Sequence, residues 1–473
     1  MIFNSIAFII FLPIVFIIYW SLRKKHLIYQ NLLLLVASYI FYGWWDWRFL
    51  SLIAFSTIID FIIGKKINSS KTKKSKKNFL IMSLIVNLGL LGYFKYFNFF
   101  IDSFKESIES LGFTFDTWTL NIILPVGISF YTFQTLSYSI DIYKGKIKHT
   151  NDFISFAVFV SFFPQLVAGP IERASHLLPQ FLKKRKFDYK TAITGVSLIS
   201  YGFFKKLVIA DRLAIYVNSV FGDIDNANTI SLLFGIIFFS FQIYADFSGY
   251  SLIARGISKL LGFDLMVNFN KPYLASSIPE FWRRWHISLS TWFRDYLYIP
   301  LGGNRVSTLR NYYNLLIVFL ISGLWHGANW TFVIWGALHG IYQVIYLQYK
   351  KLINPEDTKN KIRQFINILS VYFLVTFAWI FFRANSFNQA IEYINKIIDF
   401  DFSLNLVQVS AEKGPLNLAI SISVIVLLYL SYLLPKNLSF KRGFSHITFN
   451  VITILIIFLI GTNGKAEFIY FQF

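Results

Sequence analysis

One histidine stands at an unusual place in an otherwise apolar chain. His326 lies in the stretch SGLWHGANWTFVIWGALHG, between two long apolar runs and flanked by Gly323 and Gly327. A helix break at membrane depth that carries an ionisable side chain is costly unless it lines a cavity. An imidazole there can take a proton from a hydroxyl group that attacks a thioester. The alternative is a hydrogen-bonded packing histidine, which is the role we expect for His339.

A second histidine, His286, lies in the stretch SIPEFWRRWHISLSTWFRDYLYIPLGG, which is too polar to span a membrane. Ser277 followed by Glu280 is a capping-box pattern and predicts a helix from about Ile278. At 100° per residue, the aromatic face of this helix comprises Trp285, Leu289, Trp292 and Tyr296. Its opposite, basic face comprises Arg283, His286, Ser290 and Arg294.

Two functions fit such a helix. It can be an interfacial helix whose arginines extend toward the lipid headgroups. It can also form a cytoplasmic entrance for a polyanionic substrate, because Arg283 and Arg294, with Trp285 in the same helix, would suit the phosphates of coenzyme A. The sequence leaves both open.

The composition indicates which elements must position these histidines. The chain has 473 residues, of which 55% are hydrophobic and 15% charged, and its mean hydropathy is +0.54. A soluble protein carries about 25% charged residues. Apolar runs of about twenty residues recur, including Asn78–Phe100, Ile230–Ala245 and Leu416–Leu434. We therefore predict an all-α polytopic membrane protein with about 11 or 12 transmembrane helices plus re-entrant and interfacial helices.

Clusters of Lys and Arg predict how the chain threads the membrane, since cytoplasmic loops are rich in these residues. The net charge of +21 lies in short clusters between apolar runs, so it does not indicate nucleic-acid binding. The clusters place the N-terminus and the C-terminal tail outside. One apolar stretch, Phe153–Pro170, lies between two basic loops and contains Pro164 and Gly169. We expect a broken, re-entrant element there that lines a wet cavity.

Several kinds of chemistry lack the residues that they need. The sequence has no cysteine, which excludes disulfides and thiolate ligands, and it has no His-Glu-x-x-His motif for zinc. Nucleotide-binding glycine motifs and the Gly-x-Ser-x-Gly elbow are also missing from it. The intramembrane charges can pair structurally, or they can serve a rival function, an ion-coupled exporter of polysaccharide or lipid. These charges are Asp60, Lys205, Lys206, Asp211, Arg212 and Asp246.

Six stretches, in order along nearly the whole chain, carry a family resemblance. They are FYGWWDW (41–47), LPVGISFYTFQTLSYSIDIY (124–143), FPQLVAGPI (163–171), YADFSGYS (244–251), FNKPYLASSIPEFWRRWHISLSTWFRDYLYIPLGGNR (269–305) and GLWHGANWTFVIWGALHG (323–340). With these stretches the chain resembles the membrane-bound O-acyltransferase family, in the bacterial branch of alginate and peptidoglycan O-acetyltransferases. The resemblance implies that His326 is catalytic and that His286 is the family's second functional histidine.

The resemblance also implies substrates, a partner and a location. The acyl donor is expected to be cytoplasmic acetyl-CoA, with no bound cofactor and no metal. An extracytoplasmic SGNH-type acyltransferase is the expected partner, which hands the acyl group to a polysaccharide such as an alginate-like exopolysaccharide or a cell-wall polymer. The protein would lie in the bacterial cytoplasmic membrane, with residues 1–461 as a single membrane domain.

The C-terminal tail, residues 462–473, ends in EFIYFQF and offers an acceptor for the acyl group. Acetyl-CoA is inside and the polysaccharide outside, so some group must carry the acetyl across. No cysteine is available for a thioester carrier, whereas Tyr470 has a phenol whose ester is more activated than that of a serine. We therefore predict Tyr470 as acyl acceptor, a role that the resemblance to other envelope-acylation systems also implies for a C-terminal tyrosine among aromatics. The alternative is direct acylation of a lipid-linked or polymer hydroxyl, with the tail serving only as an aromatic anchor.

Overall fold

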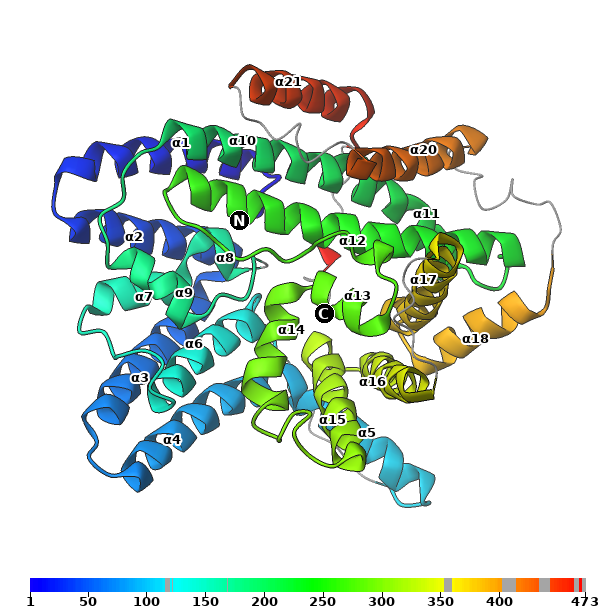
Figure 1. Cartoon of the computed structure of the whole chain (residues 1–473), viewed down its shortest axis with the longest axis horizontal. Coiled ribbons are helices and arrows are strands. Elements are labelled where there is room, and N and C mark those ends of the chain that lie inside the picture. Colours follow the sequence, from blue (N-terminus) through cyan, green and yellow to red (C-terminus); the bar gives the residue numbers. More distant parts are fainter. Residues whose placement is uncertain are drawn as a thin grey trace. The chain divides into compact units, whose positions relative to one another are not determined.

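The computed structural model describes residues 1–114, 120, 122–167, 169–352, 360–401, 414–433, 443–462, 468 and 469. Within these residues every regular element is a helix, and Figure 1 shows the helices coloured along the chain. The chain forms two compact units, and α10 and α12 contribute residues to both. The first unit comprises Met1–Ile199 and Ile253–Met266, and the second comprises Ser200–Leu252 and Val267–Phe473.

The first unit holds the N-terminal helices. They are α1 (Ile6–Ser21), η1 (Leu22–Lys24), α2 (Leu27–Asp46), η2 (Trp47–Phe49), α3 (Leu50–Ser69), α4 (Lys73–Leu91), η3 (Gly92–Tyr96), α5 (Phe97–Ser110), α6 (Ile128–Tyr143), α7 (Phe153–Ser161), α8 (Phe163–Leu166), α9 (Ala174–Phe181) and most of α10 (Tyr189–Phe203).

The second unit holds the remaining helices. They are η4 (Phe204–Ala210), α11 (Asp211–Gly222), most of α12 (Thr229–Leu260), η5 (Pro272–Leu274), α13 (Ile278–Arg284), α14 (Ile287–Phe293), η6 (Arg294–Tyr298), α15 (Thr308–His326), α16 (Trp330–Leu352), α17 (Lys361–Arg383), α18 (Phe387–Ile398), α20 (Gly414–Leu433) and α21 (Gly443–Ile460). In the two units, η3, η4 and η6 are π-helical turns.

Polar side chains mark where many helices begin. The Ser5 hydroxyl accepts a hydrogen bond from the Phe8 amide at the start of α1. Asp152 accepts one from the Ser155 amide at the start of α7. Each cap satisfies a backbone N–H that has no partner in the first turn of its helix.

Six helical stretches among the described residues are long and apolar enough to cross a membrane. They are Ile6–Lys24, Leu27–Ser69, Lys73–Ser110, Tyr189–Gly222, Thr229–Leu260 and Lys361–Arg383. Shorter apolar helices lie at Phe153–Leu166, Leu418–Leu430 and His446–Ile460. The protein is thus all-α and polytopic, as predicted from its composition. The sequence also predicts membrane crossings at Tyr312–Trp325 and Trp330–Tyr349, which lie within α15 and α16. These crossings and the orientation of the termini stay predictions.

One expected helix starts later than predicted, and the break expected in another stretch is confirmed. The apolar run Leu120–Tyr143 also predicts a membrane span, but among its described residues the helix, α6, begins only at Ile128, because Pro125 precedes Gly127, which has φ of 78°. The stretch Phe153–Pro170 is broken, as predicted: α7 ends before Phe162, and α8 begins at Phe163 with a proline in its first turn. Its re-entrant path stays a prediction.

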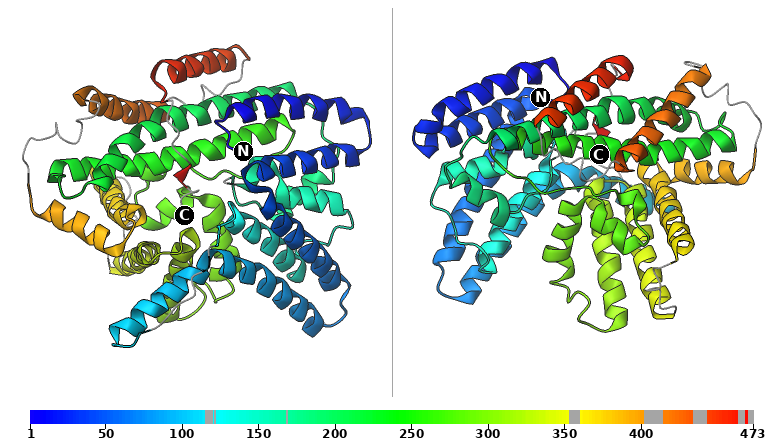
Figure 2. Two further views of the ribbon diagram at one scale, coloured as in Figure 1. Left: turned by 180° about the vertical axis from the view of Figure 1, so that it is seen from behind. Right: turned by 45° about the horizontal axis from the view of Figure 1, so that its top comes forward.

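Helices α3, α4 and α6 lie side by side in the first unit, as Figures 1 and 2 show. Asp60 of α3 is fully buried between them. Its Oδ1 accepts hydrogen bonds from the hydroxyls of Ser83 (2.6 Å) and Ser139 (3.0 Å), and its Oδ2 accepts one from the Asn87 amide group (2.8 Å). The carboxylate thus ties three helices together through neutral donors.

Candidate active site

Helices α15 and α16 of the second unit pack closely enough to fix His326 at the end of α15. A Cβ atom added to Gly323 would lie 2.2 Å from the carbonyl oxygen of Phe332. One added to Gly336 would lie 2.3 Å from the carbonyl oxygen of Phe319. Only glycine permits such a close approach of two helix backbones.

The break after His326 follows the sequence prediction. Gly327 is the C-cap of α15 and has an extended backbone. Asn329 then caps α16, since its Oδ1 accepts a hydrogen bond from the Thr331 amide (2.9 Å). The side chain of His326 is therefore held between two rigid helices, and it is 4% exposed.

The structure corrects the helix predicted around His286. The Ser277 hydroxyl caps α13 as expected, accepting a hydrogen bond from the Glu280 amide (3.3 Å). The helix ends at Arg284, however, and His286 adopts a left-handed conformation with φ of 39° and ψ of 55°. A new helix, α14, begins at Ile287. A continuous amphipathic helix with one aromatic and one basic face does not form.

The first turn of α13 is further held by Glu280. Its Oε2 accepts hydrogen bonds from the amide (2.7 Å) and hydroxyl (2.8 Å) of Ser276, and its Oε1 pairs with Arg284 (2.6 Å). Partial burial opposes ionisation of Glu280, but these hydrogen bonds and the guanidinium outweigh it and lower the pKa of the carboxyl.

Asn268 holds the backbone around His286. Its carbonyl oxygen accepts a hydrogen bond from the Ile287 amide (2.9 Å), and its Oδ1 accepts from the Ser288 hydroxyl (2.6 Å). Its own amide group donates to the Ser251 hydroxyl (3.0 Å). A left-handed backbone is unfavourable for residues other than glycine, and it persists where the surroundings impose it. Asn268 is a positioning residue that sequence reasoning missed.

The structure brings the two histidines together. The ring centres of His286 and His326 are 6.2 Å apart, with an angle of 56° between the ring planes. His286 has no exposed surface. Aromatic side chains pack around the pair. The ring centre of Trp325 lies 6.0 Å from that of His286 and 5.0 Å from that of His326, and the Phe247 ring meets the His286 ring edge-on with 4.6 Å between the centres. The pair thus occupies a water-poor site.

His339 belongs to the same aromatic cluster but has a packing geometry. Its Nδ1 accepts a hydrogen bond from the Trp282 indole N–H (3.3 Å), and its ring stacks on Phe281. The Trp335 ring contacts both histidines, with its centre 4.8 Å from that of His339 and 5.0 Å from that of His326. His339 therefore supports the wall of the site.

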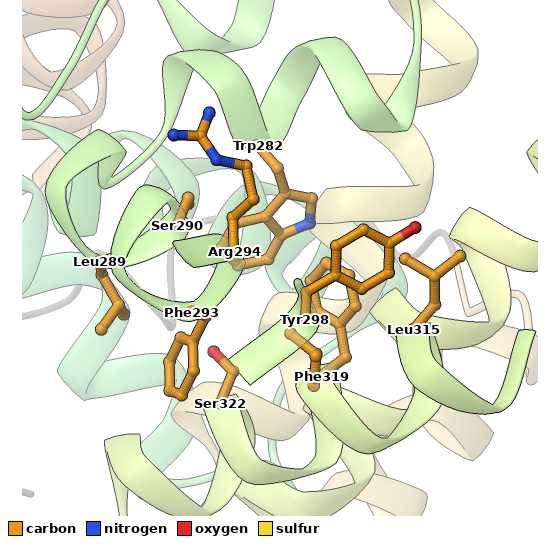
Figure 3. A pocket seen from close by; sticks show the side chains of 10 residues that line it. Trp282, Leu289, Ser290, Phe293, Arg294, Tyr298, Leu315, Phe319 and Ser322 are labelled. Carbon is orange, nitrogen blue, oxygen red and sulfur yellow. The ribbon is translucent and has the colours of Figure 1, made fainter. Parts of the chain in front are cut away.

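An apolar cavity of about 170 Å³ opens beside the site. Helices α13, α14, η6 and α15 supply its walls. Figure 3 shows the side chains that line it, among them Trp282, Arg294 and Phe319. The lining residues are Trp282, Leu289, Ser290, Phe293, Arg294, Tyr298, Leu315, Val318, Phe319 and Ser322.

The cavity lies about one helical turn from His326, because Ser322 precedes it by four residues on α15. A buried imidazole pair beside an apolar cavity suits acid–base chemistry on a substrate with an apolar portion. Among the described residues, no cluster of His, Asp and Glu side chains is arranged to hold a metal ion.

Known proteins share much of this sequence. The sequence profile of the membrane-bound O-acyltransferase family matches residues 146–389. A probable alginate O-acetylase of Pseudomonas aeruginosa is 44% identical over 392 residues, covering 82% of this chain and 73% of the relative. This chain belongs to the membrane-bound O-acyltransferase family. A peptidoglycan O-acetyltransferase of Helicobacter pylori is 37% identical over 444 residues, or 88% of this chain and 82% of that protein.

A more distant relative extends the range of polymers. A teichoic acid D-alanyltransferase of Streptococcus thermophilus is 30% identical over 262 residues, which cover 51% of this chain and 62% of the relative. The present protein is thus a membrane O-acyltransferase. Both histidines and all residues that line the cavity fall within the part that the family profile matches.

The residues expected to bind acyl-CoA lie in different surroundings in the O-acyltransferase. Arg294 is exposed and lines the cavity, and its Nε pairs with Asp295 (2.7 Å). Arg283 is exposed on α13. Trp285 is 1% exposed and stacks on Phe281, so it is part of the aromatic core. Because the helix breaks at His286, Arg283 and Arg294 do not share the basic face of one continuous helix, and that prediction is wrong. The role of all three residues toward acyl-CoA stays a prediction.

The intramembrane charges of this unit mostly pair. Lys206 of η4 makes ion pairs with Asp211 (2.9 Å) and Asp246 (2.8 Å), and all three side chains are buried. The neighbouring Lys205 donates to the Ser248 hydroxyl (3.1 Å) and lies over the Tyr244 ring. Two roles are expected for these charges, structural pairing and use by an ion-coupled exporter. The observed contacts are those of structural pairing. Tyr470, the expected acceptor, lies outside the described residues.

Proposed function

We propose that this O-acyltransferase moves an acetyl group from cytoplasmic acetyl-CoA to a hydroxyl acceptor, for O-acetylation of an extracytoplasmic polysaccharide. The main support is the buried His286–His326 pair beside an apolar cavity, in a chain of this family. Two of the relatives described above are named as acetylating enzymes of alginate and peptidoglycan, which favours acetyl over other acyl groups and a cell-envelope polymer as final acceptor.

His326 would act as general base. Its imidazole takes the proton of the acceptor hydroxyl while the hydroxyl oxygen attacks the thioester carbonyl carbon. The carbon–sulfur bond then breaks, and the coenzyme A thiolate leaves and takes up the proton. His286, with its ring centre 6.2 Å from that of His326, would donate a hydrogen bond to the carbonyl oxygen as negative charge develops there. The aromatic surroundings strengthen this interaction by excluding water.

The acyl donor would approach past Arg294. Its guanidinium is exposed while the cavity behind it is apolar, an arrangement that suits phosphates outside and a pantetheine arm and acetyl group inside. Arg283, exposed on α13, would add a second cation for the phosphates.

Tyr470 is the proposed first acceptor. The sequence offers no cysteine, and an aryl ester is activated enough to pass its acetyl group onward. A separate extracytoplasmic transferase of the SGNH type would then move the acetyl group from the tyrosine to the polysaccharide. The final acceptor is an alginate-like exopolysaccharide or a cell-wall polymer.

The experiment compares purified wild type with His326→Ala and Tyr470→Phe. Labelled acetyl-CoA is supplied, and mass spectrometry of the C-terminal peptide reports acetyl-Tyr470. We expect label on the wild-type peptide and none on either variant, with thermal unfolding near that of the wild type. A fully active His326→Ala would overturn the general base. Active protein that never carries acetyl-Tyr470 would overturn the tyrosine step and favour direct acylation.

A further inference from the structure

The described end of the chain returns to the interior of the second unit. Phe468 and Ile469 are 3% and 4% exposed, and Ile469 packs in the same hydrophobic cluster as Trp285 and Trp335. Residues near a chain end are usually poorly ordered unless specific contacts hold them. The contacts of these two residues therefore indicate a binding site for the segment.

A buried carboxylate binds the backbone of this segment. The Ile469 amide donates a hydrogen bond of 2.7 Å to Oδ2 of Asp246 in α12. The other oxygen of Asp246, Oδ1, pairs with Lys206 (2.8 Å), which in turn pairs with Asp211 (2.9 Å). Lys206 thus compensates the buried charge of Asp246, while Oδ2 serves the main chain.

A second anchor holds the chain before this point. The amide and hydroxyl of Thr462 both donate to the carbonyl oxygen of Leu207, at 3.0 and 3.1 Å. Arg212 donates to the carbonyl oxygen of Ile460 at the end of α21 (2.8 Å). Leu207 lies in the π-helical turn η4, directly after Lys206. This turn therefore supplies Leu207, which binds Thr462, and Lys206, which pairs with the aspartate that binds the Ile469 amide.

Aromatic contacts connect the docked segment to the histidine pair. The Phe468 ring stacks on Tyr250 at 4.5 Å and lies 5.9 Å from Phe247. Phe247 in turn meets the His286 ring edge-on at 4.6 Å. A single ring thus separates Phe468 from the candidate active site.

We propose that Asp246, held by Lys206, is a positioning residue that docks the chain's own C-terminal segment beside His286. The ligand of this site is a short peptide with an aromatic and an aliphatic residue in sequence, bound through a main-chain N–H. Docking itself does not require an acylated tyrosine; any consequence of docking for acyl transfer rests on the proposed function.

The absence of cysteine from the sequence gives a direct test in the full chain. The substitution Ile469→Cys leaves the backbone N–H of residue 469 in place. Its thiol is expected to react slowly with a maleimide, because residue 469 is buried. Adding Asp246→Ala removes a hydrogen bond to a charged acceptor and should speed labelling about 10-fold or more. The rates are measured in detergent-solubilised protein by mass spectrometry.

Asp211→Ala is the matched control, because it also removes one carboxylate from Lys206, whereas Asp211 makes no hydrogen bond or ion pair with the described residues of the segment. We expect it to leave the labelling rate within about 2-fold of the Ile469→Cys background. Equal acceleration by both variants, or no acceleration by Asp246→Ala, would overturn the proposal.

Hydrogen exchange of the C-terminal peptide in chains without the engineered cysteine provides an independent measurement. Asp246→Ala should raise exchange there, whereas Asp211→Ala should not. His326→Ala should abolish acyl transfer while the segment stays protected. This result separates the docking site from the proposed function, since each can fail without the other.

Discussion

Asp60 in the first unit and Asp246 in the second are both buried aspartates on long helices, but their partners differ in kind. Asp60 receives three hydrogen bonds from uncharged side chains, each from a neighbouring helix. Asp246 instead shares a lysine with Asp211 and gives its other oxygen to the main chain near the C-terminus. The hydrogen bonds of Asp60 come only from helices packed next to α3, whereas Asp246 also binds a segment that is distant in sequence.

This difference suggests how to distinguish a structural buried charge from a functional one in a membrane protein. A carboxylate whose acceptor positions are filled by adjacent helices contributes to packing. A carboxylate that is neutralised on one side, with its other oxygen on a segment more than two hundred residues away in sequence, can hold or release that segment. The following variants test this distinction.

Lys206→Met should have the largest effect on stability. It leaves Asp211 and Asp246 buried side by side without a cation, and breaking such a pair costs about 3–5 kcal/mol. Thermal and denaturant unfolding in detergent measure the loss. Lys205→Met is the control, because that lysine has hydroxyl and ring partners and forms no ion pair with a carboxylate of the described residues. Equal losses in the two variants would contradict the ion-pair account.

Asp60→Ala should come next, with a loss of about 2–4 kcal/mol, because three buried donors lose their acceptor. The same unfolding assay applies. Asp60→Asn should be milder, since its amide oxygen still accepts. In the Ile469→Cys background, Asp60→Asn should leave maleimide labelling unchanged; faster labelling would show that the two clusters are not independent.

Asp246→Asn separates the effect of charge from that of hydrogen bonding in the cluster of Lys206, Asp211 and Asp246. The amide oxygen can still accept from Ile469, and Asp211 still pairs with Lys206. We expect labelling of Ile469→Cys to rise by less than the 10-fold of Asp246→Ala, with about 1 kcal/mol lost in unfolding. Labelling as fast as in Asp246→Ala would mean that the charge itself holds the segment.

Thr462→Val should have the smallest effect. It removes the hydroxyl that donates to Leu207 but keeps the amide that donates to the same oxygen. About 0.5–1 kcal/mol should be lost, and the labelling rate at residue 469 should change less than in Asp246→Asn. A larger change would make this contact, and not Asp246, the main anchor of the segment.

The sequence predicted those features whose signals are local. Glycines around His326 and the cap at Asn329 marked the helix break, and the cap at Ser277 marked the start of α13. The length and polarity of the apolar runs predicted an all-α membrane protein. Each of these signals depends on residues within one or two helical turns.

Features that depend on distant contacts were not predicted. The periodicity around His286 favoured one continuous helix, because nothing local shows that Asn268 holds its neighbours. The pairing of Lys206 with Asp246 joins residues forty positions apart, and α18, which packs Tyr393 into the core, was not predicted at all. The role of Tyr470 was predicted from its chemistry, and it awaits the acetyl-tyrosine measurement.

The left-handed backbone of His286 affects how substitutions at this position are interpreted. Alanine removes the imidazole and also places an ordinary residue in a strained conformation, so its effect mixes two causes. Asparagine and glycine adopt that conformation more readily. A series of Ala, Asn and Gly at residue 286 therefore separates the contribution of the ring from that of the chain path, and a directed-evolution library at this codon should be enriched in residues that tolerate positive φ.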